Sequence, residues 1–218
     1  MPVNNNKGQS IYVYGDEQMP VQSNIHFYVN WAKERLDEME AVLKSLESKV
    51  GEVQVDARGK ADKALAELRK GRDIFRDTVK KQAEANEAAW SSAKAKLEPE
   101  WNAFEADVKK YVESFSKQVG EQQATFKLQS AAQLKAWREA AEKVGGDTKK
   151  FAAERQAEID AAVKRMQADA AVAEEKLHKH LDQMGTQSWT ALMAALTETR
   201  AAFDRANEAV RDAFKQGA

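Results

Sequence analysis

Hydrophobic residues recur along this chain at intervals of three and four, and the pattern is nearly continuous from residue 24 to residue 216. That spacing places them on one face of an α-helix. The pattern starts just after Ser23 and Asn24, either of which suits a helix N-cap. The sequence therefore predicts an all-α protein built from long amphipathic helices.

The first part of the pattern, residues 28–57, is a heptad seam, in which apolar side chains alternate at three and four residues. The seam consists of Leu36, Met39, Leu43, Leu46, Val50 and Val53. Such a seam is typical of a left-handed coiled coil. It needs a partner helix to cover it.

The second part, residues 61–144, repeats every eleven residues instead of every seven. Eleven residues make three turns, so the stripe stays on one face of a nearly straight helix. Its bulky members are Trp90, Trp101, Phe104, Phe115, Phe126 and Trp137. This aromatic stripe has two interpretations: packing against a returning helix, or adsorption to lipid or a hydrophobic polymer, as bulky amphipathic faces do.

Proline and glycine divide the pattern at few places. Pro99 would normally break a helix, but the eleven-residue phase crosses it unshifted, so we favour a kinked, continuous helix over a sharp turn. Gly145 and Gly146 precede Asp147 and Thr148, and this combination predicts a turn at residues 145–147.

The simplest assembly is an elongated antiparallel helical hairpin or coiled coil. A long arm at residues 24–144 meets a return arm at residues 148–216, with Gly185 as either a second turn or a weak point. The shorter return arm would leave the heptad seam bare, which predicts a homodimer or higher oligomer formed through residues 28–57. Folding again at Pro99 or Gly185 would instead give a three- or four-helix bundle.

Residues 1–23 differ from the rest of the chain. They hold two of the three prolines and one strand-like fragment, residues 11–14. A lone fragment of this kind cannot form a stable sheet. It is either a tail packed on a helix or a peptide that docks on the sheet edge of a partner.

The composition of the chain disfavours some classes of function. Charged residues make up 32% of the 218 residues, yet the formal net charge is −1. A nucleic-acid binder would show a basic excess or stripe, so this class is disfavoured. The chain has no cysteine and no run of 18 apolar residues, so we expect no transmembrane segment and a cytoplasmic location.

Residues suited to catalysis or metal binding form no recognisable motif. His178 and His180 lie on different faces of a helix, and Glu174 with His178 and Asp182 has the spacing of a solvated, charged face. No phosphate loop, nucleophile elbow or dinucleotide fingerprint is present. We therefore expect no metal, no cofactor and no enzyme activity, with a helical-bundle carrier or enzyme as the second alternative.

The C-terminal part of the chain carries a resemblance. Residues 188–192 and 199–207 look like Ala-rich helical proteins of alphaproteobacteria. Parts of residues 100–216 also resemble phasins, which coat polyester storage granules, and the eleven-residue periodicity is similar to that of exchangeable apolipoproteins. The resemblance implies a non-catalytic, self-associating scaffold that coats a hydrophobic granule or membrane surface. The alternative is a structural filament or adaptor with protein partners alone.

Overall fold

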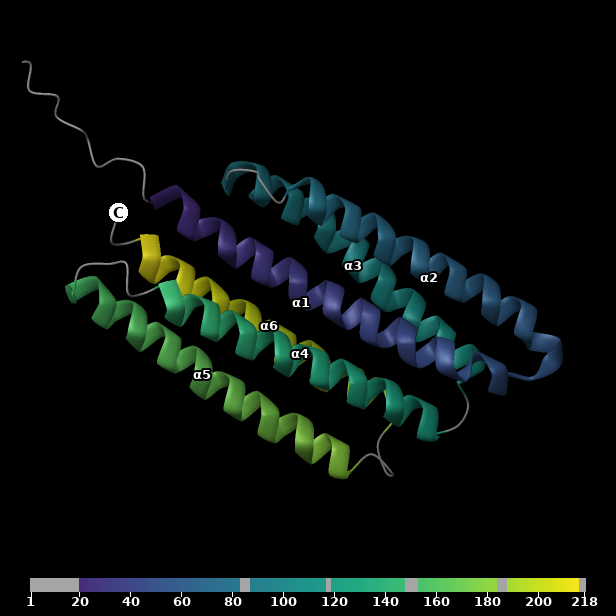
Figure 1. Ribbon diagram of the computed structural model, residues 1–218. Helices are drawn as coiled ribbons and strands as arrows, with labels where there is room; N and C mark the ends of the chain where they lie inside the picture. Colours follow the sequence, from purple (N-terminus) through teal and green to yellow (C-terminus); the bar gives the residue numbers. More distant parts are fainter. Residues whose placement is uncertain (1–19, 83–86, 117–118, 148–152, 184–187, 216–218) are drawn as a thin grey trace, which may run out of the picture.

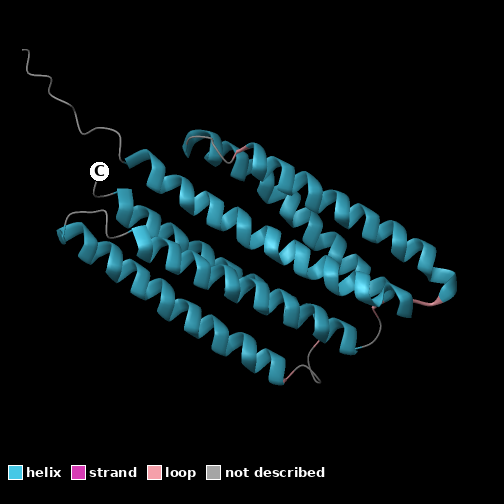
Figure 2. Ribbon diagram, in the orientation of Figure 1, coloured by secondary structure: helices cyan, strands magenta, loops and turns pink. Residues whose placement is uncertain are grey.

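The computed structural model describes residues 20–82, 87–116, 119–147, 153–183 and 188–215. Within these ranges the chain forms helices and no strand (Figure 2). The elements are α1 (Pro20–Lys49), η1 (Val50–Glu52), α2 (Val55–Lys81), α3 (Glu87–Phe115), α4 (Val119–Asp147), α5 (Ala153–Asp182) and α6 (Trp189–Lys215). The prediction of an all-α chain is confirmed for the part of the chain that is described.

Successive helices reverse direction, and each packs against the next except α3 and α4, which lie on opposite sides of α1 (Figure 1). The first helix, α1, takes the central position, where it packs against α2 and α3 on one side and against α4 and α6 on the other. The outermost helix, α5, packs against α4 and α6. Because α1 has neighbours on several sides, it buries polar as well as apolar side chains.

The predicted long arm at residues 24–144 is wrong. This region holds four α-helices, α1 to α4, and the first begins at Pro20, before the predicted N-cap. Proline is readily accepted in the first turn of a helix, where its missing N–H has no intrahelical acceptor. Residues 1–19 lie outside the described residues, so the two interpretations of the tail remain predictions.

The first break follows α1, where η1 redirects the chain into α2. The guanidinium of Arg58 donates a hydrogen bond to the carbonyl oxygen of Gly51 at 2.8 Å, which ties α2 to this turn. The next two breaks fall between Lys81 and Glu87 and between Phe115 and Val119. Neither contains a proline, which explains why the sequence pattern passes over them.

The predicted helix breaks and turns are partly correct. The helix α3 continues through Pro99, as expected. The turn predicted at residues 145–147 is wrong, because these residues form the end of α4 and no described glycine has a positive φ angle. The return arm at residues 148–216 is interrupted between Asp182 and Trp189. Gly185 itself lies outside the described residues.

The apolar core has two clusters, and they largely follow two halves of the chain. The first cluster is centred on α1, α2 and α3 and contains the pair Trp31 and Phe75, with ring centroids 6.2 Å apart. The second joins α4, α5 and α6 around Trp137 and Phe203, whose rings meet edge to face at 5.5 Å. We call residues 20–115 the N-terminal half and residues 119–215 the C-terminal half. Among the described helices, none is long and apolar enough to cross a membrane.

Candidate functional site

The heptad seam of α1 lies inside the chain's own core. Met39, Leu43 and Leu46 are buried in the first apolar cluster. Leu36, Val50 and Val53 are partly buried and pack against the same cluster. The expectation that this seam lacks an internal partner is therefore wrong, because four other helices surround α1. The described residues leave no bare apolar stripe at this position.

The aromatic stripe is also internal in this structure. Trp90, Trp101, Phe104 and Phe126 are buried in the first cluster, and Phe115 packs against its edge. Trp137 lies in the second cluster. The eleven-residue repeat thus keeps these side chains facing the core although they belong to two different helices, α3 and α4.

Four indole groups are buried without a hydrogen-bond partner. The Nε1 atoms of Trp31, Trp90, Trp137 and Trp189 have no acceptor among the described residues. A buried tryptophan normally finds an acceptor for this N–H group. Leaving a buried donor unpaired costs about 1–3 kcal/mol. Each unpaired N–H group therefore subtracts from the favourable burial of its own ring.

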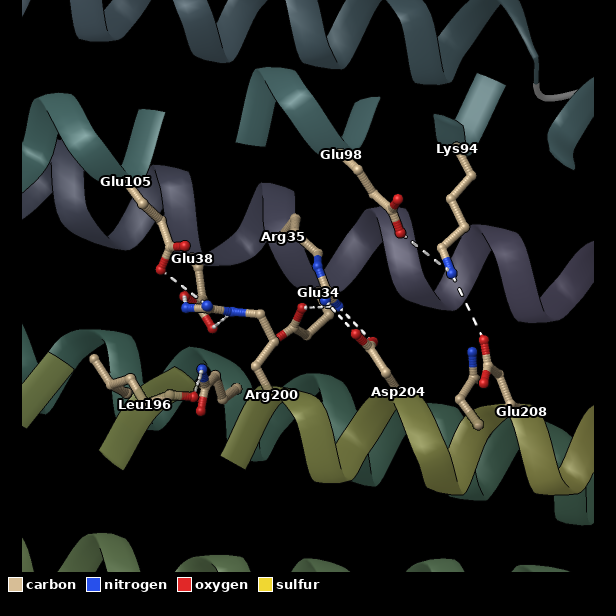
Figure 3. Close-up of polar contacts among 12 residues, drawn as sticks. Glu34, Arg35, Glu38, Lys94, Glu98, Glu105, Leu196, Arg200, Asp204 and Glu208 are labelled. Atoms are coloured by element: carbon tan, nitrogen blue, oxygen red, sulfur yellow. Dashed lines mark hydrogen bonds and ion pairs between the residues drawn. The ribbon is translucent and has the colours of Figure 1, made fainter. Parts of the chain in front are cut away.

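A buried ionic cluster connects α1, α3 and α6 (Figure 3). Its centre is Arg200 of α6, which lies 2.8 Å from Glu38 of α1 and 2.9 Å from Glu105 of α3. Arg200 and Glu38 are almost fully buried, whereas Glu105 reaches partly into solvent. One side chain thus ties three helices together.

A second arginine extends this cluster along α1. Both terminal nitrogens of Arg35 donate to the carboxylate of Asp204 on α6, at 2.8 and 2.6 Å. Arg35 also lies 2.8 Å from its neighbour Glu34. Such a two-point contact between guanidinium and carboxylate fixes orientation as well as distance.

The cluster contains four carboxyl groups and two guanidinium groups, so it cannot balance its charge if every acid is ionised. Burial raises the pKa of Glu34 well above its usual value, and the charge of Glu38 adds to this, although Arg35 and Arg200 act in the opposite direction. For Arg200, burial alone would lower the pKa, but the charges of Glu38 and Glu105 outweigh it and raise it.

The ionic cluster and the aromatic core are in direct contact. The guanidinium of Arg200 lies over the ring of Trp101, 4.6 Å from its centroid. That of Arg35 lies over Trp31 at 4.9 Å. A cation over an indole face is stabilised by the ring quadrupole. Moving either arginine would therefore disturb the packing of an aromatic ring.

Polar contacts join the two halves of the chain at further points. Lys94 of α3 lies 3.7 Å from Glu208 of α6. The hydroxyl groups of Ser45 and Thr125 are 2.8 Å apart, between α1 and α4. At the other end, the side-chain amide of Asn207 donates to the carbonyl oxygen of Phe27 at 2.9 Å. The boundary between the halves is thus held by polar contacts over much of its length.

Sequence reasoning missed this cluster, although a signal was present. Arg200 lies four residues after Leu196 and three before Phe203, so it occupies the apolar face of its helix. Glu34 and Glu38 are spaced four apart, as like charges on one helix face, which destabilises a helix unless a cation lies between them. A charge at a core position requires a buried partner.

The cluster and the aromatic core hold helices together through ion pairs and ring contacts. The described residues contain no group of three His, Cys, Asp or Glu side chains that could hold a metal. His178 lies 3.8 Å from Glu174 on an exposed surface, as its spacing predicted. The sequence matches no protein-family model, no curated protein and no solved structure.

Proposed function

We propose that this protein is a non-catalytic coat protein, which opens its helices and spreads their apolar faces on a hydrophobic surface. The surface is that of a storage granule or a membrane. This proposal joins the resemblance to phasins and apolipoproteins with the internal position of the aromatic stripe. A protein that coats such a surface in this way must expose side chains that are internal when it is free in solution.

The observation that carries the proposal is the set of four buried indole N–H groups without partners. At an interface between water and an apolar phase, an indole ring can lie in the apolar phase while its N–H group meets water. Opening would therefore give these donors the hydrogen bonds that the closed core denies them. The aromatic rings would exchange one apolar environment for another, at little cost in burial.

The boundary between the two halves is a suitable place for opening. Its ion pairs, centred on Arg200 and Arg35, can be replaced by contacts with water when the halves part. Burying ions carries a desolvation penalty that such a separation would relieve. The apolar clusters, in contrast, would need the hydrophobic surface to replace the lost packing. Opening is thus coupled to binding.

A disulfide lock tests this proposal. The hydroxyl groups of Ser45 and Thr125 face each other at 2.8 Å across the boundary. The variant S45C/T125C would join α1 to α4 when oxidised and release them when reduced. Because the chain has no cysteine of its own, the wild type is a control for the oxidising and reducing conditions.

Binding is measured by co-sedimentation with liposomes of neutral lipid and with polyester particles. We expect the wild type and the reduced variant to sediment with at least one of these, and the oxidised variant to stay in the supernatant. If the wild type ignores both surfaces, the coat proposal is wrong. If the oxidised variant binds as well as the reduced one, the protein is a coat but does not open at this boundary.

A further inference from the structure

A groove runs along the outer face of the α5 and α6 pair. Its volume is about 750 Å³, and no described residue of α4 lines it. Its apolar lining is mostly alanine, including Ala161 of α5 and Ala209 of α6. Such small side chains allow another helix to approach closely. The groove therefore provides a shallow, helix-sized surface with charged residues along its sides.

The charges of this groove are ordered along its length. Glu158 of α5 and Asp212 of α6 lie toward one end. Arg165 and Arg205 lie on the same two helices, each seven residues from the acidic residue of its own helix. Seven residues span about 10 Å along an α-helix and return to nearly the same face. The groove thus has an acidic end and, roughly 10 Å away, a basic section, beyond which Asp169 of α5 adds one more acidic side chain.

These four side chains are poorly matched within the chain. Glu158 and Arg205 are exposed, and Arg205 acts on Glu198 through its charge. Arg165 has a long hydrogen bond of 3.4 Å to the carbonyl oxygen of Ala161. Asp212 contacts its neighbour Arg211 at 3.3 Å. They therefore retain the capacity to pair with charges from outside the chain.

We propose that a second copy of this chain docks on the groove, face to face and antiparallel. A two-fold axis near Ala161 and Ala209, running across the two helices, would place α5 over the partner's α5 and α6 over the partner's α6. Glu158 would then face the partner's Arg165, and Asp212 would face the partner's Arg205. The symmetry repeats both contacts, so four ion pairs surround an alanine-lined centre.

The charge order also selects this orientation. A two-fold axis parallel to the helices would place Glu158 against the partner's Asp212 and Arg165 against the partner's Arg205. Like charges in contact across an interface are repulsive and disfavour the wrong arrangement. The same four residues thus favour the antiparallel dimer and disfavour the parallel one.

The expected dimer is weak. Two helices with a width of about 10 Å each, in contact over about 25 Å, cover roughly 500 Å² on each copy. A total of roughly 1,000 Å² lies at the low end of specific interfaces. We therefore expect a dissociation constant on the order of micromolar. This dimer does not depend on the proposed coating function, and it replaces residues 28–57 as the site of self-association.

A charge swap in the full-length chain tests the proposal by sedimentation equilibrium. The single variants R165E and E158R each place like charges together at two symmetric contacts, and we expect either to raise the dissociation constant at least about tenfold. The double variant E158R/R165E restores opposite charges and should recover dimerisation. Because Glu158 and Arg165 are about 10 Å apart along one helix, this rescue cannot come from a contact within the chain.

Lys60 of α2 provides the matched control. It is exposed and outside the groove, so K60E changes the net charge by the same amount as R165E and should leave the dimer unchanged. If the wild type stays monomeric into the high micromolar range, the dimer proposal is wrong. The groove would then be a binding surface for a helix of another protein. A dimer that both single variants leave intact would overturn the proposal as well.

Discussion

Arg200 and Glu38 are 162 residues apart in the chain, yet their side chains meet at 2.8 Å, with no more than 5% of either exposed. This contact joins the last helix to the first at the centre of the molecule. Removing one member of a buried ion pair leaves the other without compensation, which typically costs 3–5 kcal/mol. The first prediction follows from this asymmetry.

We expect R200M to lower the free energy of unfolding by about 3–5 kcal/mol, as measured by urea denaturation. The double variant E38M/R200M removes both charges and should recover a large part of this loss. The control is K176M, since Lys176 pairs with Glu198 on an exposed surface, where such a pair contributes about 1 kcal/mol or less. Equal losses in R200M and K176M would contradict the assigned role of Arg200.

The second prediction concerns the pH dependence of stability through Glu34. Its pKa in the folded protein is raised by burial, so the folded state binds this proton more tightly than the unfolded state does. The stabilising contribution is complete below the ordinary pKa of a glutamate, about 4.3, and is lost as the pH rises toward the folded pKa. We expect E34Q to remove this loss of stability at higher pH.

Urea denaturation between pH 4.5 and pH 8.5 compares E34Q with the wild type. The advantage of E34Q should grow with pH, because each unit of pKa shift corresponds to about 1.4 kcal/mol. The control is E98Q, since Glu98 is an exposed residue of α3 that lies 3.5 Å from Lys94. A constant difference between E34Q and wild type across this range would show that Glu34 does not titrate as described.

The third prediction uses the unpaired indole of Trp137. Replacing it by alanine removes a large buried ring, which typically costs 3–5 kcal/mol. W137F keeps most of the ring volume and removes an N–H group that has no acceptor. We therefore expect W137F to cost about 1 kcal/mol or less, because the lost donor was unfavourable in the core. A loss in W137F close to that of W137A would show that the N–H group is paired in solution.

The fourth prediction concerns Pro99, an exposed residue within α3. A proline inside a helix removes one backbone hydrogen bond and clashes with the preceding turn, at a cost of about 3 kcal/mol. Part of this cost is offset by the reduced freedom of the unfolded chain. We expect P99A to raise the free energy of unfolding by about 1–3 kcal/mol. A destabilised P99A would indicate that the proline shapes α3 for packing.

The sequence pattern predicts helix and core face well, but it conceals where the chain turns. The helices α2, α3 and α4 begin at residues 55, 87 and 119, which is a regular spacing of 32 residues. This is close to three units of eleven residues, so a break shifts the phase of the stripe very little. The unshifted phase across Pro99 correctly indicated a continuous helix. The same reasoning also treated the connections before Glu87 and Val119 as continuous helix, and it therefore wrongly predicted one long arm.

The position of α1 could not be predicted from its own residues. Its heptad seam describes one buried face, whereas Glu34, Arg35 and Glu38 are buried on others. Whether a charged residue of a helix meets water or another helix depends on neighbours distant in sequence, such as Arg200 and Asp204. The partners of the cluster are set by the order and packing of the helices. A local sequence pattern does not contain this information.

The central place of α1 also has a consequence for how the protein is made. Its Phe27 accepts a hydrogen bond from Asn207, which follows 180 residues later. Translation at about 5–20 residues per second takes roughly 10–35 s to cover that distance. During this interval the first helix has left the ribosome while its last neighbour does not yet exist. The nascent chain therefore passes through a period in which the face of α1 that packs against α6 is uncovered, and a hydrophobic surface present at the site of synthesis would meet the protein before it has closed.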